Sequence, residues 1–273
     1  MPDAPPRSTN SSAGVAAALV SARLSGRALA GFPGALPADL PAAYRCQDEA
    51  IALWPAPVVG WKVGYIAAAR RGTDADDRLV GPVFADRLQH DSEAGPVFAV
   101  IDGGFAAVEA EYVFRLGQDA DPARLDWSPG DAAALVAALH IGVELAGSPL
   151  AAINEIGPLA VVSDCGNNAG LVLGAPIADW RSVLEQDLLC SCWIDGELVG
   201  RGGAPNLPGG PLAALAFALA RNALRGRPLR AGDLVTTGAA TGIHDIRAGQ
   251  RAVVDFGRHG RIRCHAVAAA AKD

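Results

Sequence analysis

Acidic residues in an apolar setting are the clearest sign of chemistry in this sequence. Glu109 and Glu111 alternate with apolar residues in the run 108–114, a pattern typical of a strand. Residues i and i+2 of a strand share a face, so the two carboxylates would project side by side. Burying them is costly unless a hard divalent cation accepts both as ligands. Glu144 is a third acid in an apolar run, and together the three would suit an octahedral Mg²⁺ or Mn²⁺ site. Taken alone, the pattern also fits an edge strand whose glutamates face solvent.

The charge balance restricts the classes of partner. The formal net charge is −6 at neutral pH and no basic stripe is visible, so nucleic-acid binding is not expected. An anionic substrate would then need a local cation or a bound metal to attract it. No apolar run reaches the ~18 residues of a membrane span, and the polar start lacks the features of a secretory signal. Five cysteines without such a signal predict reduced thiols and a cytoplasmic location.

The elements that must position these acids follow a helix-first order. Hydrophobic periodicity predicts helices over 13–31 and 38–54, a short strand over 58–64, a loop-rich stretch over 65–95, and two strands within 96–116. A helix is expected from Asp131 to His140, followed by strands over 141–147, 170–177, 188–200, 233–240 and 249–267 and a helix over 210–225. Helices followed by many strands favour an α+β fold with a mixed or antiparallel sheet over a doubly wound one. The predicted organisation is a disordered terminus (1–12), a helical segment (13–57) and a metal-binding, catalytic β-rich domain (58–273).

Six segments in register, spread over about residues 15 to 267, resemble the hydratase branch of the fumarylacetoacetase-like superfamily. They are the N-terminal helices and the segments GWKVG (60–64), GPVFAD (81–86), VEAE (108–111), VELAGS (143–148) and LRAGDLVTTG (229–238). The branch includes 2-keto-4-pentenoate hydratases, 2-oxohept-3-enedioate hydratases and 4-oxalocrotonate decarboxylases. The resemblance implies a mixed β-roll/sandwich of the fumarylacetoacetase C-terminal-domain type, preceded by N-terminal helices, and a homo-oligomer.

The same resemblance implies roles for individual residues. Glu109, Glu111 and Glu144 match the positions that bind Mg²⁺ or Mn²⁺ in the family. Lys62 matches an active-site lysine, and Asp86 matches an aspartate that pairs with that lysine in proposed proton transfers. If Lys62 is desolvated near the metal, its pKa would fall towards neutrality, and it could serve as acid or base.

Substrate contacts are less well defined by the sequence. Arg201 lies in the glycine-rich segment 200–211, where it could clamp a distal carboxylate or be a solvated loop residue. Of Thr236 and Thr237, strand alternation should turn one inward, and Thr237 is the expected substrate contact. Two family features are missing. Gly147-Ser148 is followed by proline instead of arginine, and the loop ending Gly209-Gly210-Pro211 lacks the usual histidine.

The implied activity is a divalent-metal-dependent hydratase of aromatic-compound catabolism. It would add water to a small anionic acid, a 2-hydroxydienoate or 2-oxo-enoate. A 4-oxalocrotonate-type decarboxylase needs the same metal-stabilised enolate, and the sequence does not separate the two. A C–C bond hydrolase of acylpyruvates is disfavoured because no convincing His–acid pair is present. A non-catalytic partner subunit is disfavoured because the three glutamates and Lys62 are intact.

Overall fold

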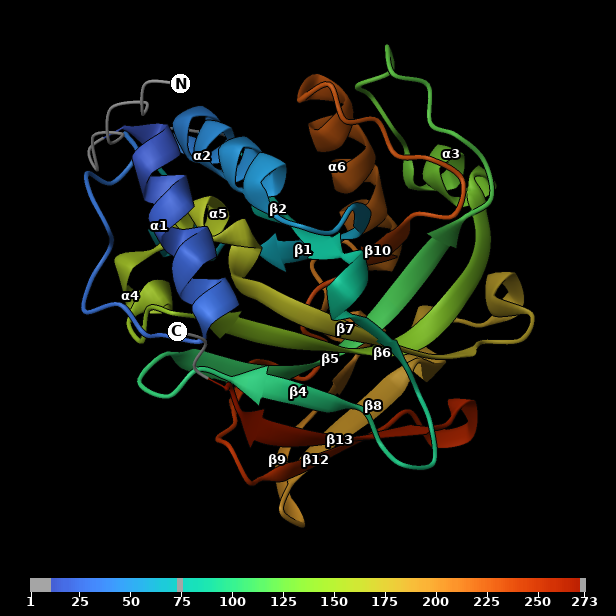
Figure 1. Cartoon of the computed structure of the whole chain (residues 1–273). Coiled ribbons are helices and arrows are strands. Elements are labelled where there is room, and N and C mark those ends of the chain that lie inside the picture. The colour runs from blue at the N-terminus through green and yellow to red at the C-terminus, as the bar shows by residue number, and fades with distance from the viewer. Residues whose placement is uncertain (1–10, 73–75, 271–273) are drawn as a thin grey trace.

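The chain forms two β-sheets with helices gathered on one side, as the computed structural model of residues 11–72 and 76–270 shows (Figure 1). The helices are α1 (Ser12–Ser25), α2 (Leu40–Leu53), α3 (Pro129–Ala134), α4 (Ile153–Ile156), α5 (Pro158–Ser163) and α6 (Pro211–Leu224). The strands are β1 (Val58–Tyr65), β2 (Arg78–Phe84), β3 (Leu88–His90), β4 (Val97–Val100), β5 (Phe105–Leu116), β6 (Val136–Ser148), β7 (Asn168–Pro176), β8 (Leu189–Ile194), β9 (Glu197–Gly203), β10 (Leu234–Thr236), β11 (His244–Asp245), β12 (Arg251–Asp255) and β13 (Arg261–Ala268).

Both sheets mix parallel and antiparallel pairs. The larger sheet has the order β2-β1-β10-β5-β6-β7-β3, with β11 added on β5, and the smaller has the order β4-β13-β12-β8-β9. The pairs β1–β10, β3–β7 and β4–β13 are parallel, and the other pairs of the described strands are antiparallel. In Figure 1, α1, α2 and α6 lie at the top and the smaller sheet lies at the bottom. This arrangement confirms the predicted α+β class with N-terminal helices before mixed sheets.

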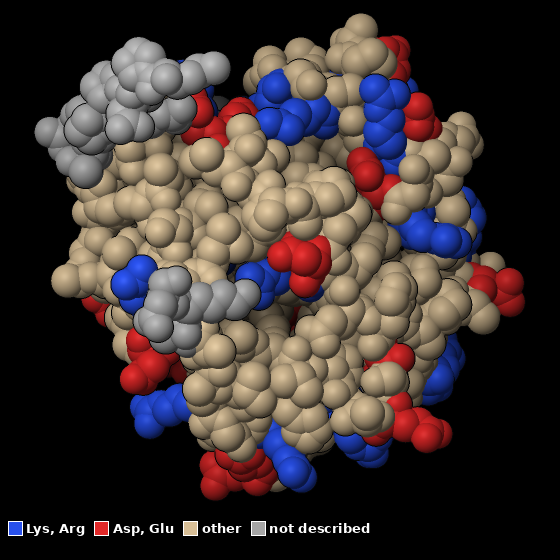
Figure 2. Space-filling model, in the orientation of Figure 1, with Lys and Arg blue, Asp and Glu red and all other residues tan. Residues whose placement is uncertain are grey.

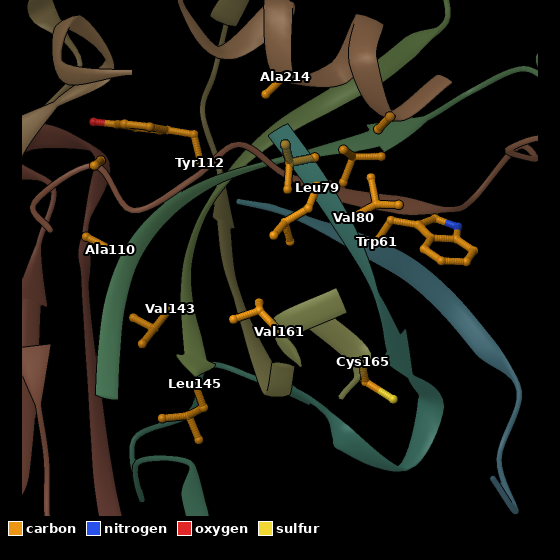
Figure 3. Close-up of a cluster of buried hydrophobic side chains, with 14 of the residues drawn as sticks. Trp61, Leu79, Val80, Ala110, Tyr112, Val143, Leu145, Val161, Cys165 and Ala214 are labelled. Atoms are coloured by element: carbon orange, nitrogen blue, oxygen red, sulfur yellow. The ribbon is translucent and has the colours of Figure 1, made fainter. Parts of the chain in front are cut away.

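Strand β5 separates the core from the face that carries the acids. Ala110 and Tyr112 point into a buried apolar cluster with side chains of the neighbouring strand β6 (Figure 3). The Tyr112 ring also meets Phe256, which follows β12 of the smaller sheet, edge-on at 5.6 Å between centroids. Because neighbouring residues of a strand point to opposite faces, packing this side fixes Glu109 and Glu111 on the other side.

Three element predictions are corrected by the structure. The first helix ends at Ser25, where Gly26 takes a left-handed φ of 66°, and does not continue to residue 31. The stretch 65–95 is not loop throughout, because the buried apolar run of β2 pairs with β1. The helix expected from Asp131 to His140 ends at Ala134, and His140 lies on β6. The alanine-rich segment 133–139 favours helix locally, but β5–β6 pairing over the whole length of β5 overrides that propensity.

The predicted disordered terminus covers two residues that are ordered. Residues 1–10 lie outside the described part of the chain. Ser11 is the N-cap of α1 and accepts a hydrogen bond from the amide of Gly14 at 3.1 Å, so the helix begins at Ser12.

Among the described residues, no helix is long and apolar enough to cross a lipid bilayer. On the face seen in Figure 2, lysine and arginine side chains are interspersed with aspartate and glutamate and form no continuous basic stripe.

Candidate metal centre and active site

Three buried glutamates converge between two adjacent strands. Glu109 of β5 and Glu144 of β6 are directly paired across the antiparallel ladder, and Glu111 lies two residues further along β5. Directly opposed residues of such a pair share a face, which brings the three side chains together. One carboxylate oxygen of each lies within 4.8 Å of the others, and at most 4% of each residue is exposed. The predicted convergence of the three acids is thus present, and the alternative of solvent-facing glutamates is wrong.

Lys62 supplies a positive charge to this cluster. Its Nζ lies 3.1 Å from Oε1 of Glu144 and donates a hydrogen bond to Oδ1 of Asn167 at 3.2 Å. Burial by itself would lower the pKa of Lys62, but the charges of Glu144 and Glu109 raise it above its ordinary value. The sequence-based expectation of a lowered pKa was for Lys62 beside a bound metal, whose positive charge would oppose the effect of the two carboxylates.

The segment after β10 orients the acids. The amides of Thr237 and Gly238 donate to the same oxygen of Glu111, Oε2, at 2.9 and 2.7 Å. The hydroxyl of Thr236 donates to Oε2 of Glu144 at 3.3 Å. Thr237 lines the cavity as expected, but its hydroxyl donates to the carbonyl of Tyr112 at 3.0 Å. Both threonines are therefore buried at the site, and their backbone and side chains mainly hold the carboxylates.

The cluster fits a divalent cation. Oε1 of Glu111 is buried and has no hydrogen-bond partner among the described residues. Burial, and then the charges of Glu144 and Glu109, raise the pKa of Glu111 well above its ordinary value. Lys62 alone does not balance three carboxylates, whereas a hard divalent cation such as Mg²⁺ or Mn²⁺ would take these carboxylate oxygens as ligands.

A cavity of about 820 Å³ opens beside Lys62 and Glu109. Its wall includes Thr237 and Gly238 from the segment after β10, Asn154 and Asn167 from the segment between β6 and β7, and Leu207. The cavity wall thus combines apolar side chains with several polar groups, as small-molecule sites do. The site is suited to a small organic acid with an apolar carbon chain.

Two predicted site residues lie elsewhere. Asp86 accepts a hydrogen bond from Nε1 of Trp54 at 3.0 Å, lies 3.6 Å from Arg87 and does not line the cavity. Asn167 takes the position beside Lys62 that was expected for Asp86. Arg201 is exposed on β9 and is also absent from the cavity wall. Its neighbours Gly200 and Gly202 pack against residues 240–244, so alternation turns Arg201 to the opposite face.

The sequence analysis missed Asn167, and its local backbone explains its position. Cys165, Gly166 and Asn167 all have positive φ, at 56°, 67° and 50°. A Cβ on Gly166 would lie 2.8 Å from Cα of Gly81, so this turn packs directly on β2 opposite Lys62. The sequence Cys-Gly-Asn-Asn is a turn signal, but it does not reveal which strand the turn contacts.

Comparisons with known proteins agree with this site. The family model described as fumarylacetoacetate hydrolase C-terminal matches residues 96–267, which include all three glutamates. The chain belongs to the fumarylacetoacetate hydrolase family. This family member is 32% identical over 240 residues to a 2-keto-4-pentenoate hydratase of Burkholderia vietnamiensis, covering 84% of this chain and 87% of that protein. The predicted family is thereby confirmed.

Solved structures show the same fold. The fumarylacetoacetate hydrolase family member aligns with 4-oxalocrotonate decarboxylase from Pseudomonas putida G7, complexed with magnesium and adipate, at a TM-score of 0.75 and 22% identity, covering 94% and 97% of the two chains. Fumarylpyruvate hydrolase from Pseudomonas aeruginosa, in complex with Mn²⁺ and pyruvate, aligns at a TM-score of 0.55 and 18% identity, covering 78% of this chain and 91% of the other. The predicted β-roll/sandwich type is confirmed by these fold matches.

Proposed function

We propose that this protein is a divalent-metal-dependent hydratase of the 2-keto-4-pentenoate hydratase type. It adds water to a small 2-hydroxydienoate or 2-oxo-enoate acid. The observation that carries the proposal is the buried cluster of Glu109, Glu111 and Glu144 beside Lys62, at the wall of a cavity of about 820 Å³. Relatives with the hydratase name, at about the same length, support it.

In this proposal the three glutamates hold Mg²⁺ or Mn²⁺. The bound cation supplies Lewis-acid stabilisation of negative charge on the 2-oxo-acid unit. Thr237 and Gly238 keep one oxygen of Glu111 in place through their amides, which leaves its other oxygen free to act as a ligand. Thr236 similarly holds Glu144.

Lys62 has the proton-transfer role. Hydration needs one proton transfer as the dienol becomes an α,β-unsaturated ketone, and another as water adds to the distal carbon. The Nζ of Lys62 is held between Glu144 and Asn167 at the cavity wall, where it can give a proton to or take one from a bound acid. Asp86 and Arg201 have no part in this proposal because neither lines the cavity.

The surroundings of the site belong to the same proposal. A cytoplasmic location is supported by five free cysteines, all of them buried. A homo-oligomer is supported by exposed apolar side chains on β8 and β9, namely Leu189, Leu198 and Val199. Light scattering on the purified protein measures the number of chains directly.

Turnover with defined substrates tests the activity. The purified protein is incubated with Mn²⁺ or Mg²⁺ and 2-hydroxypenta-2,4-dienoate, and the dienol absorbance and product mass are followed. We expect the absorbance to fall and the product to gain one water. Release of CO₂ from a 2-oxo-enedioate without hydration would instead support the decarboxylase, which uses the same cluster. Mn²⁺ binding without any turnover would favour a non-catalytic subunit.

Replacing Lys62 separates the proton-transfer role from metal binding. We expect Lys62→Met to lower kcat by about 100-fold or more, because general acid–base catalysis contributes that much. Mn²⁺ should still bind, since the three carboxylates remain, whereas Glu111→Gln should lose it. Steady-state kinetics and Mn²⁺ titration measure the two effects. Asp86→Asn should change kcat less than about threefold, because Asp86 does not line the cavity; a loss as large as that of Lys62→Met would restore the sequence-based role of Asp86.

A further inference from the structure

An acidic side chain outside the glutamate cluster faces the cavity from β11. Asp245 is paired with Ala107 across the antiparallel ladder between β11 and β5, and directly opposed residues share a face. Phe105 and Glu109 lie two residues to either side of Ala107 on that face, and both line the cavity, as Asp245 does. Asp245 is therefore a diagonal neighbour of Glu109, a spacing of roughly 7–8 Å.

Contacts of its neighbours fix the orientation of Asp245. The amide of Ile246 donates to the carbonyl of Ala106 at 3.0 Å, which secures the pairing of β11 with β5. His244 turns to the opposite face, where a Cβ added to Gly200 of β9 would overlap its imidazole ring. Because successive residues of a strand alternate between faces, Asp245 is directed into the cavity.

The carboxylate of Asp245 is accessible to water. Asp245 is exposed, and within residues 11–72 and 76–270 its side chain has no hydrogen-bond or ion-pair partner. Lys62, in contrast, is buried, and its Nζ is held by Glu144 and by Oδ1 of Asn167. Nδ2 of Asn167 donates in turn to Oδ1 of Asn154 at 3.2 Å. The cavity thus has one buried group for proton transfer and one acid that water reaches directly.

The position of Asp245 suits the second of the two proton transfers in hydration. A carbon chain whose 2-oxo-acid end lies at the three glutamates extends along the cavity wall, and Asp245 lies on that wall next to Glu109. We propose that Asp245 is the general base that activates the water added to the distal carbon. This inference rests on the proposed function, because it assigns the water-addition step of that reaction.

The proposed step balances in atoms and charge. One carboxylate oxygen of Asp245 takes a proton from water while the water oxygen bonds to the β-carbon of the unsaturated 2-oxo acid. The electron pair of the carbon–carbon double bond shifts towards the 2-oxo oxygen, and Lys62 then protonates the α-carbon, which restores the ketone. After the product leaves, Asp245 gives its proton to solvent and Lys62 takes one up.

Glu155 provides a matched control. It is exposed and lines the same cavity, but it belongs to α4 and not to the strands that carry the three glutamates. Asp245→Asn and Glu155→Gln each remove one negative charge from the cavity and hardly change the size of the side chain. An effect that came only from the loss of charge would therefore appear in both variants.

Two substrates separate water addition from the earlier proton transfer. The Mn²⁺-loaded protein is given 2-hydroxypenta-2,4-dienoate, which must first become the unsaturated ketone, or 2-oxopent-3-enoate, which only needs water. We expect Asp245→Asn to form the hydrated product about 100-fold more slowly or worse from either compound. Consumption of the dienol, corrected for its rate without protein, should stay within about threefold, so that the unhydrated 2-oxo acid accumulates. Absorbance and product mass follow the two steps, and Glu155→Gln should change neither step by more than about threefold.

Each outcome decides the assignment. Retained dienol consumption shows that Asp245→Asn is folded and keeps its site intact. Unchanged hydration in Asp245→Asn, an equal loss in Glu155→Gln, or an equal loss of dienol consumption and hydration would overturn the role of Asp245. If the unaltered protein hydrates neither compound, the hydratase proposal fails and the role of Asp245 fails with it. If the unaltered protein and Asp245→Asn hydrate both compounds alike, only the role of Asp245 fails.

Discussion

At the scale of single residues, the sequence identified the acids of the site by two arguments. The argument for Glu109 and Glu111 was stronger than the argument for Glu144. The spacing of Glu109 and Glu111 in an apolar strand placed them on one face by geometry alone. Nothing in the spacing joined them to Glu144, which is 33 residues further on; it was a candidate as an acid in an apolar run of its own, and the family resemblance then strengthened it. The structure supplies the reason for the match, which is the direct pairing of Glu109 with Glu144.

The ionisation of Glu109 predicts how the metal-free protein responds to pH. Burial, opposed by Lys62 and reinforced by Glu144, raises the pKa of Glu109 to about 7. An unfolded chain has the ordinary value of about 4.3, so between these values the folded state binds more protons. The stabilising effect is complete below the unfolded pKa and is lost as pH rises through 7, by up to about 1.4 kcal/mol per pH unit.

Melting curves in EDTA between about pH 5 and about pH 8 measure this slope. We expect Glu109→Gln to reduce this slope without abolishing it, because glutamine does not titrate whereas Glu111, whose pKa is also raised, still does. Added Mn²⁺ should raise the melting temperature more at the alkaline end, since the cation binds the deprotonated carboxylates. A slope that is identical in Glu109→Gln and in the unaltered protein would contradict the assignment.

At the scale of elements, the sequence predicted β5, β7 and α6 but not what contacts them. Strand β2 was missed because the charged run before it resembles a loop, while its own apolar residues are interrupted by Gly81 and Pro82. Arg201 was misplaced because its glycine-rich surroundings suggested a loop, whereas they form β9. Asn167 was missed because its role depends on β2 and a turn between β6 and β7 touching, and such long-range contacts leave no local pattern.

The contact between β2 and that turn can be broken selectively. A Cβ added at Gly81 would overlap the carbonyl oxygen of Cys165. We expect Gly81→Ala to destabilise the protein by about 1–3 kcal/mol, as overpacking does, and to lower kcat because Asn167 and Lys62 move apart. Thermal melting and kinetics measure the two effects.

A matched glycine provides the control for this substitution. Gly31 is exposed and has no atom within 4 Å of an added Cβ. Gly31→Ala should therefore change stability by less than about 0.5 kcal/mol. Equal effects of the two alanines would mean that the packing at Gly81 is not tight.

At the scale of the whole molecule, we propose that the N-terminal helical segment and the β-rich catalytic part unfold together. Nε of Arg23 in α1 lies 2.5 Å from Asp164, and the same guanidinium donates to the carbonyls of Gly147 and Asn168. The side chains of Arg23 and Asp164 are 7% and 0% exposed, so this ion pair is buried although its members are 141 residues apart. Arg23 thus ties the first helix to β6 and β7.

Removing this guanidinium should be costly. Arg23→Met leaves the carboxylate of Asp164 buried without its ion partner, and we expect a loss of about 3–5 kcal/mol in the free energy of unfolding. Chemical denaturation measures it, with the exposed Arg27→Met as control. Combining Arg23→Met with Asp164→Leu should recover part of the loss, because no unpaired charge then remains. Simple addition of the two single effects would argue against the pair as the link.

The two carboxamides beside Lys62 have a consequence for isotope experiments. An asparagine side chain forms hydrogen bonds but is not among the groups that ionise in proteins, so Asn167 and Asn154 orient the ammonium group without conducting its protons. They therefore provide no path for proton transfer between Lys62 and the solvent-exposed part of the cavity. We therefore expect that, while a ligand fills the cavity, a deuteron on Lys62 passes to that ligand or to Glu144 rather than to bulk water.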